Sequence, residues 1–146
     1  MVLKLNDEKI AEYTFNDIDI GLEKFFQVKI TSSMVDDFVR LSGDYNPLHT
    51  DKNFAKSNNF KSTVCHGMLL ASFLSRLVGM YIPGRNGLYF SQSLNFINPG
   101  YIDDVITISG KVVSKSQSTK VITLKMSIKN SEHELIYGEA KVFLIK

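Results

Sequence analysis

Residues 67–80 are almost continuously apolar, and the pattern of the chain changes after Pro83-Gly84. A helix over 67–80 would be hydrophobic on most of its faces, and such a helix is stable only when other elements surround it. The segments after residue 84 instead alternate with period two and are rich in Val, Ile, Thr and Phe, as strands are. The sequence therefore predicts an α+β fold with an antiparallel meander. A curved sheet wrapped around the central helix is consistent with this pattern, although periodicity alone does not establish the wrapping.

The strands of the meander are expected at 89–97, 105–114, 121–128 and 135–145, with hairpin loops at 114–118 and 129–132. Two shorter strands are expected near the start of the chain, at 10–14 and 25–30.

A helix is predicted between these two groups of strands. Ser33 and Asp36 have the spacing of a capping box, and apolar residues then repeat at helical intervals until Gly43, which is a typical helix end. Residues 44–50 are expected to be irregular. Asp51 is expected to cap a short helical piece that fades near 58–59.

Composition restricts the class of protein. With 146 residues, 44% hydrophobic and 22% charged, the chain is expected to be a single domain over 1–146 with one core. A net charge of +2 and the lack of a basic run interleaved with aromatic residues give no reason to expect nucleic acid. Cys65 is the only cysteine, so no internal disulfide can form.

No membrane partner is expected either. The longest apolar run is interrupted by Ser72, Ser75 and Arg76 and is shorter than the roughly 20 residues that a membrane span needs. The first eight residues become acidic too early for a secretory signal. We therefore expect a cytoplasmic protein.

Asp44 and His49 are the first candidates for chemistry. They lie in the segment Ser-Gly-Asp-Tyr-Asn-Pro-Leu-His over 42–49, which is too rich in Gly, Asn and Pro for a regular helix. A carboxylate and a neutral imidazole can hold one water between them, one group accepting its proton and the other orienting it. The same residues would also suit a simple turn with a histidine on the surface. The position between two helical segments favours the functional interpretation, because such loops often carry function.

His66-Gly67 is the second candidate, at the predicted start of the apolar helix. The first N–H groups of a helix have no partner within it, and the helix dipole favours negative charge there. Glycine also allows a ligand to approach the backbone closely. The amide of Gly67 could therefore stabilise an oxygen that gains negative charge, although a plain helix start would show the same two residues.

Other residues give weaker signals. Ser72 and Ser75 would share one helix face, where serines usually bond to the preceding turn. Cys65 is not expected to be a nucleophile activated by His66, because adjacent residues seldom face each other. The histidines and the cysteine have no chelating spacing, so no metal is expected.

These motifs resemble those of the MaoC-like dehydratases, and most of all those of the (R)-specific enoyl-CoA hydratases. The resemblance rests on the segment 42–51, on Val-Cys-His-Gly-Met-Leu-Leu-Ala-Ser over 64–72, on Tyr-Phe-Ser-Gln-Ser-Leu-Asn-Phe over 89–96, and on Asp-Asp-Val over 103–105. It extends from about Thr31 to the C-terminus.

The resemblance implies a hot-dog fold, a homodimer, and reversible syn hydration of a trans-2-enoyl thioester to an (R)-3-hydroxyacyl thioester without a cofactor. It implies that Asp44 and His49 activate water and that the Gly67 amide is the oxyanion donor. Asn46, Ser75 and His66 are the expected substrate-binding residues; Ser75 falls where the family has a serine near the acyl group, and Asn46 where an Asn supports the catalytic loop. The substrate would be carried by CoA or by acyl carrier protein.

Two departures from the family pattern concern acyl-chain preference: Arg76, where a small residue is expected, and Pro99-Gly100, where an apolar-Pro pair is usual. Lys56, Lys61 and Arg85 could meet the phosphates of CoA or an acidic carrier, or could simply be solvated. A hot-dog thioesterase and a non-catalytic acyl-thioester binding module are the alternative functions.

Overall fold

The computed structural model describes residues 8–146. The helices are η1 (Phe15–Asp17, 3-10), α1 (Ser32–Ser42), α2 (Pro47–Thr50), α3 (Lys52–Ser57), α4 (Gly67–Arg76) and η2 (Leu77–Tyr81, a π-helix). The strands are β1 (Glu23–Lys29), β2 (Gly87–Gln92), β3 (Asn95–Phe96), β4 (Val105–Ser116), β5 (Val121–Lys129) and β6 (Glu134–Leu144). The expected strand at 25–30 and the three strands after residue 100 are confirmed, with ends shifted by a few residues.

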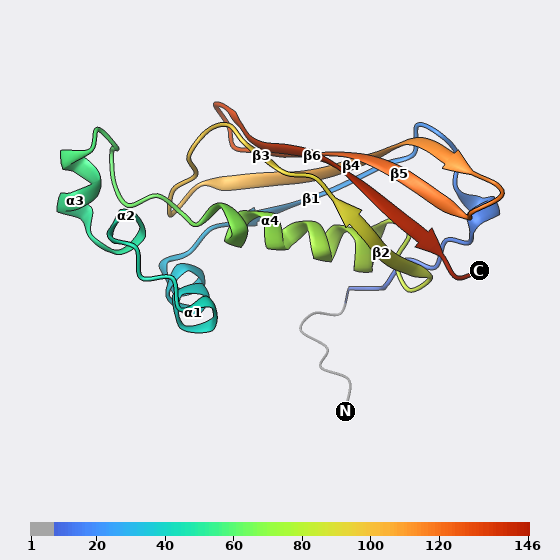
Figure 1. The fold of residues 1–146 in the computed structure, drawn as a ribbon, viewed down its shortest axis with the longest axis horizontal. Coiled ribbons are helices and arrows are strands. Elements are labelled where there is room, and N and C mark those ends of the chain that lie inside the picture. Colours follow the sequence, from blue (N-terminus) through green and yellow to red (C-terminus); the bar gives the residue numbers. More distant parts are fainter. Residues whose placement is uncertain (1–7) are drawn as a thin grey trace.

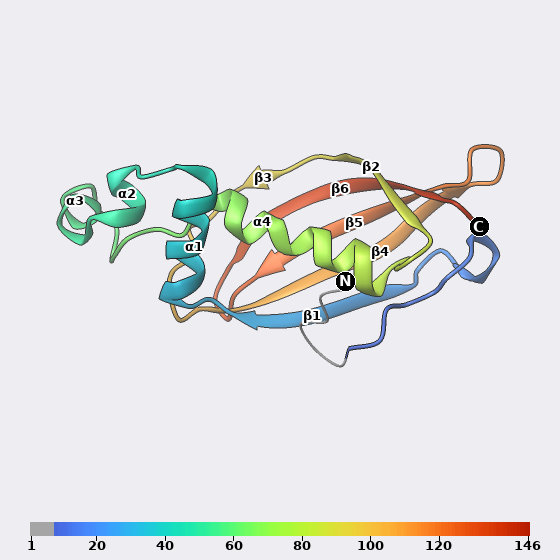
Figure 2. The same cartoon turned by 90° about the horizontal axis from the view of Figure 1, so that it is seen from below.

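One antiparallel sheet contains all the strands. Its order is β1-β4-β5-β6-β2, and the short β3 also pairs with β6. The sheet curves around α4, which runs along its concave face, while α1, α2 and α3 gather at one end of the molecule (Figures 1 and 2). This is the α+β arrangement that the sequence predicts, a curved sheet around a central helix.

The core lies between α4 and the sheet. The strands bury alternate side chains on this face, and one row across three strands consists of Ile108, Ile128 and Ile136. Leu70 and Leu74 of α4 and Leu77 at the start of η2 pack from the other side, and Leu77 is completely buried. Because both partners are apolar, their mutual burial supplies the main driving force for this packing.

Two predictions about strands were wrong. In the segment 10–14 only Glu12 makes a bridge, to Gly84. The segment 89–97 is split into β2 and β3. At the break, the hydroxyl of Ser93 accepts a hydrogen bond from the N–H of Glu139 at 2.9 Å, so a side chain replaces a backbone acceptor and the regular ladder ends.

The helices also differ from the prediction in detail. Thr31, not Ser33, caps α1, and its hydroxyl accepts from the N–H of Met34 at 3.2 Å. Residues 47–50, expected to be irregular, form the short helix α2, which starts with Pro47. The apolar helix leaves α-geometry after Arg76, and the N–H of Ile82 donates to the carbonyl of Leu77 five residues earlier. The predicted cap at Asp51 is confirmed by bonds from the N–H groups of the next helix.

Within residues 8–146, no helix is long and apolar enough to cross a membrane. The N-terminal residues on which the cytoplasmic expectation depends lie almost entirely outside the described residues.

Candidate active site

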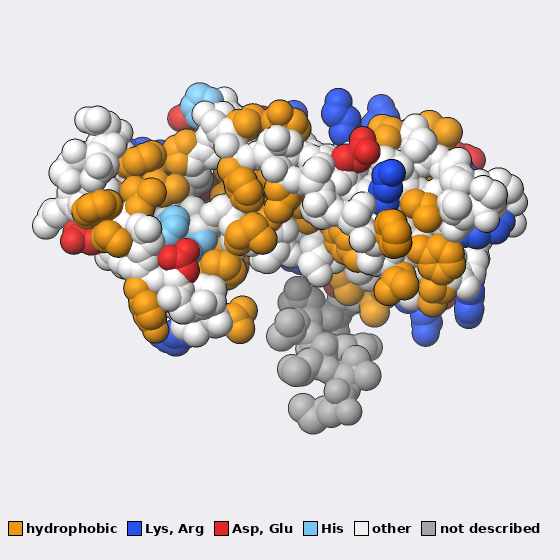
Figure 3. Space-filling model, viewed as in Figure 1, with side chains coloured by type: hydrophobic (Ala, Val, Ile, Leu, Met, Phe, Trp, Pro, Cys, Tyr) orange, Lys and Arg blue, Asp and Glu red, His pale blue; other side chains and the backbone are white. Residues whose placement is uncertain are grey.

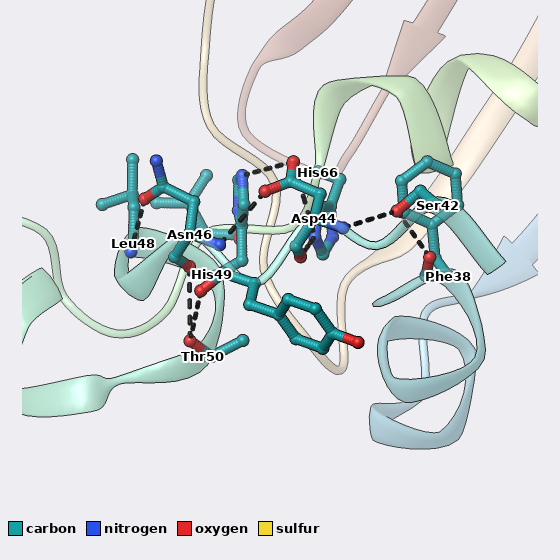
Figure 4. Close-up of polar contacts among 10 residues, drawn as sticks. Phe38, Ser42, Asp44, Asn46, Leu48, His49, Thr50 and His66 are labelled. Carbon is teal, nitrogen blue, oxygen red and sulfur yellow. Dashed lines mark hydrogen bonds and ion pairs between the residues drawn. The ribbon is translucent and has the colours of Figure 1, made fainter. Parts of the chain in front are cut away.

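Asp44 and His49 meet at the end of the molecule that carries α1, α2 and α3. Gly43 ends α1 in the left-handed conformation, with φ of 74°, and thereby turns the chain into the loop that holds Asp44. The short helix α2 then brings His49 back, so that its Nε2 lies 3.9 Å from Oδ2 of Asp44 (Figure 4). This distance is too long for a direct hydrogen bond but allows one water to bond to both groups.

One hydrogen bond fixes the orientation of the His49 ring. Its Nδ1 lies 2.6 Å from the carbonyl oxygen of Val64. A carbonyl can only accept, so Nδ1 carries a proton and donates it, and this bond directs Nε2 toward Asp44. His49 is mostly buried, with 16% of its side chain exposed, while 47% of the Asp44 side chain is exposed. The pair therefore consists of an oriented base and an accessible carboxylate.

The loop around Asp44 is fixed by local hydrogen bonds. The N–H of Asp44 donates to the hydroxyl of Ser42 at 3.2 Å, and Oδ1 of Asp44 accepts from the N–H of Asn46 at 3.1 Å. The side chain of Asn46 caps α2 by accepting from the N–H of Leu48 at 2.9 Å. Asn46 thus holds both the carboxylate and the helix that carries the imidazole.

His66 lies behind this pair. Its ring stacks on that of His49, with centroids 3.9 Å apart, and contacts Phe38 of α1 on the other side. Only 2% of its side chain is exposed, and its Nε2 lies 3.2 Å from the carbonyl oxygen of Asp44. Sequence reasoning did not find this contact, because His66 lies 22 residues from Asp44 and no spacing rule connects the two.

The fold also brings together three side chains that could hold a metal ion. One ligand atom each from Asp44, His49 and His66 lies within 4.8 Å of the other two. The sequence showed no such cluster. Coordination through Nε2 of His66 would require the proton on that atom to leave, since it now donates to the carbonyl of Asp44.

Gly67 begins α4 beside the pair. No described residue accepts a hydrogen bond from its N–H. A side chain at this position would meet the ring of Phe96, because a Cβ would lie 2.6 Å from one ring carbon. Glycine is thus required for the close approach of β3. His49, Gly67 and Phe96 line a first cleft of about 580 Å³, which also borders Phe60 and Pro99.

A second, mainly apolar cleft of about 540 Å³ lies on the other side of Met68. Ser72 and Ser75 both line it, so the predicted common face is confirmed. The hydroxyl of Ser72 donates to the carbonyl of Leu69. Tyr89 also lines this cleft, and burial raises the pKa of its phenol to about 12.

The opening of the site is visible on the surface. Histidine atoms and an acidic side chain come to the surface together at the end of the molecule formed by α1, α2 and α3, with hydrophobic side chains around them (Figure 3). The Gly67 amide and His49 line the same cleft, so a small ligand there could contact both.

The structure separates other candidates from this site. Arg76 is paired with Glu8 at 2.9 Å and lies over the ring of Phe26, and it lines neither cleft. Arg85 is paired with Glu12 at 2.9 Å. Lys61 lies over the ring of Tyr101.

The comparisons with known proteins all indicate the same protein family. A family model described as MaoC like domain matches residues 16–133. An (R)-specific enoyl-CoA hydratase of Aeromonas caviae is 34% identical over 87% of this chain and 96% of its own length. A protein with the same name from Rhodospirillum rubrum is 33% identical over 94% of this chain and 95% of its own length.

Solved structures share the fold. The (R)-hydratase from A. caviae involved in PHA biosynthesis superposes with a TM-score of 0.83 at 34% identity, over 87% of this chain and 97% of that chain. The curved sheet around a central helix in this chain is the hot-dog fold of these proteins.

Proposed function

The chain belongs to the MaoC-like dehydratase family, and from this membership we propose that it is an (R)-specific enoyl-thioester hydratase. It would reversibly add water to a trans-2-enoyl thioester and form the (R)-3-hydroxyacyl thioester. The observation that carries the proposal is the 3.9 Å separation of Oδ2 of Asp44 and Nε2 of His49, together with the cleft that His49 and Gly67 line in common.

In this proposal the acid/base pair activates water. A water held between the two side chains gives a proton to Nε2 of His49, while the Asp44 carboxylate orients it. The water oxygen forms a bond to C3 of the acyl group, the C2–C3 double bond opens, and C2 receives a proton from the pair. One water is consumed, and its hydroxyl and hydrogen end on C3 and C2 of the same face.

The Gly67 amide supports this step by stabilising charge. When water adds at C3, electron density moves to the thioester oxygen. The unpartnered N–H of Gly67, at the positive end of α4, is the group that would bond to this oxygen. Because the thioester itself withdraws electrons, the reaction needs no cofactor. Ser75 lines the second cleft, where the acyl chain would lie beyond Met68.

The test uses hydration of crotonyl-CoA, followed by the loss of absorbance of the conjugated thioester. Asp44→Asn and His49→Gln should each lower the rate by about 10²–10⁴-fold, the usual size of a general acid/base contribution. His133→Gln is the control, because His133 lies in the β5–β6 hairpin with 59% of its side chain exposed. Its rate should not change.

Three results would contradict the proposal: wild-type rates in both site variants, an (S) product in a chiral assay, or no hydration at high enzyme concentration. Release of free CoA thiol would indicate a thioesterase instead. Tight binding of acyl-CoA without turnover would indicate a binding module. Arg76, one of the two departures from the family pattern, is explained by its pairing with Glu8 without reference to the substrate.

The carrier and the assembly are part of the same proposal. We propose a CoA or acyl-carrier-protein thioester as substrate and a homodimer as the assembly. The homodimer is supported by the outer edge of β2, which pairs with no further strand of the described residues and where Leu88 and Phe90 are 59% and 73% exposed. Lys61 is the remaining candidate for contact with phosphates or an acidic carrier. It follows Phe60, which lines the first cleft.

A further inference from the structure

His66 is a buried polar residue that the proposed chemistry does not use. Its side chain lines neither cleft, and the ring of His49 lies on one face while Phe38 lies on the other. A substrate in either cleft therefore meets other residues first. If His66 serves the reaction, it acts through the residues that it contacts.

The surroundings of the two ring nitrogens of His66 differ. Nε2 faces the carbonyl of Asp44 at 3.2 Å, so Nε2 carries the proton. Nδ1 is buried and has no hydrogen-bond partner among the described residues. A proton on Nδ1 would therefore be a buried donor without an acceptor among the described residues, whereas Nε2 has the carbonyl of Asp44 as its acceptor.

These contacts connect the two halves of the site. His66 holds the backbone of Asp44 through Nε2 and supports His49 by stacking (Figure 4). Its own backbone leads directly into Gly67, whose amide is the proposed oxyanion donor. The same residue thus touches the carboxylate segment and the imidazole and is bonded to the amide.

We propose that His66 is a positioning residue, whose imidazole sets the spacing between the Asp44–His49 pair and the Gly67 amide. This inference rests on the proposed hydratase function. It replaces the expectation that His66 binds the substrate. A positioning residue affects the alignment of reacting groups, and a misplacement of 1 Å can cost about a hundredfold in rate.

The kinetic test compares His66→Phe, which keeps an aromatic ring but loses the donor, with His66→Gln, which keeps an N–H of similar reach. His66→Phe should lower kcat by about 10- to 100-fold, while KM for crotonyl-CoA stays within about threefold because the substrate does not touch residue 66. His66→Gln should recover a large part of kcat. Circular dichroism and thermal unfolding establish that each variant folds, and His133→Phe serves as the control.

A double variant separates positioning from general loss of structure. If His66 acts through Asp44, His66→Phe should cost less than about threefold in an Asp44→Asn background, because the loss is then no longer additive. A fully additive loss, a wild-type kcat in His66→Phe, or a change confined to KM would overturn the inference.

A measurement without substrate keeps the inference independent of the proposed activity. Nitrogen-15 spectra of the histidine rings should show the proton on Nε2 of His66 and on Nδ1 of His49, and His66→Leu should shift the His49 signals. A proton on Nδ1 of His66 would overturn the inference. If instead the spectra agree but the wild type does not hydrate enoyl thioesters, the proposed function fails while the arrangement of His66 stands.

Discussion

At the scale of single residues, the environment of Cys65 determines how reactive its thiol is. Cys65 is buried, and desolvation together with the charge of Asp104 raises the pKa of its thiol from 9.0 to about 12. Only the thiolate is nucleophilic, so this thiol is almost entirely in the unreactive form at neutral pH. The expectation that Cys65 is not a nucleophile agrees with this environment.

The thiol of Cys65 should therefore react slowly in the native protein. Because thiolate concentration falls tenfold for each unit of pKa, alkylation by iodoacetamide at pH 7.5 should be about a thousandfold slower than in the unfolded chain. The rate should rise with pH up to about 12, the pKa of the buried thiol. Cys65 is the only cysteine, so mass spectrometry of the modified protein reports on it alone. Rapid native labelling at pH 7.5 would contradict the burial argument.

The sequence could predict which side chains of the candidate site lie close together where this depends on local spacing. Asp44 and His49 are joined by a short loop and a four-residue helix, so their proximity follows from the segment itself. The stacking of His66 on His49 depends on how α4 packs against α1 and α2. No pattern within one segment carries that information, and the sequence therefore predicted a candidate residue without its contacts.

At the scale of elements, the start of α1 shows why a motif can mislead. Ser33 and Asp36 have capping-box spacing, yet Thr31 is the cap. The N–H of Ile30 still bonds to the carbonyl of Asp104 at 2.9 Å, next to the β1–β4 ladder, so Thr31 is the first residue free to begin the helix. The neighbouring strand decides where the helix begins, and sequence spacing alone does not show this.

This assignment makes a prediction about stability. Thr31→Ala should lower the free energy of unfolding by about 1 kcal/mol, since it leaves the N–H of Met34 without its acceptor. Ser33→Ala is the matched control, because Ser33 lies inside the helix and is exposed. It should change stability by less than about 0.5 kcal/mol. Urea unfolding of the two variants measures the difference, and a larger loss for Ser33 would restore the capping-box assignment.

Strands were predictable where one face is buried. In β4, β5 and β6 buried and less buried positions largely alternate, which is the period that the sequence shows. The segment 10–14 has a similar composition but makes only one bridge. A strand needs a partner of sufficient length, and partners are a property of the whole fold.

At the scale of the whole molecule, the two edges of the sheet differ. At one edge is β1, and at the other is β2, which exposes Leu88 and Phe90. An exposed apolar edge strand is a template for pairing with another chain. The proposed homodimer would cover it.

Phe90→Lys should therefore weaken self-association. A charge at the centre of a dimer edge would have to be buried without a partner, so the variant should shift from dimer to monomer at micromolar concentration. Analytical ultracentrifugation of the wild type and of this variant measures the change. Phe25→Lys is the control, because Phe25 is also exposed, at 65%, but lies on β1 at the opposite edge. A wild-type monomer, or equal association of both variants, would contradict the proposed interface.

The direct peptide bond between His66 and Gly67 has a further consequence for how such a chain can vary. Two groups that are consecutive in the backbone keep a fixed separation through any change in loop length elsewhere, whereas Asp44 and His49 depend on the lengths of the segments around them. Insertions in the loop at 58–63 would lengthen the connection between α3 and α4 but would leave residues 66 and 67 adjacent. The peptide bond itself thus fixes the distance between His66 and the Gly67 amide.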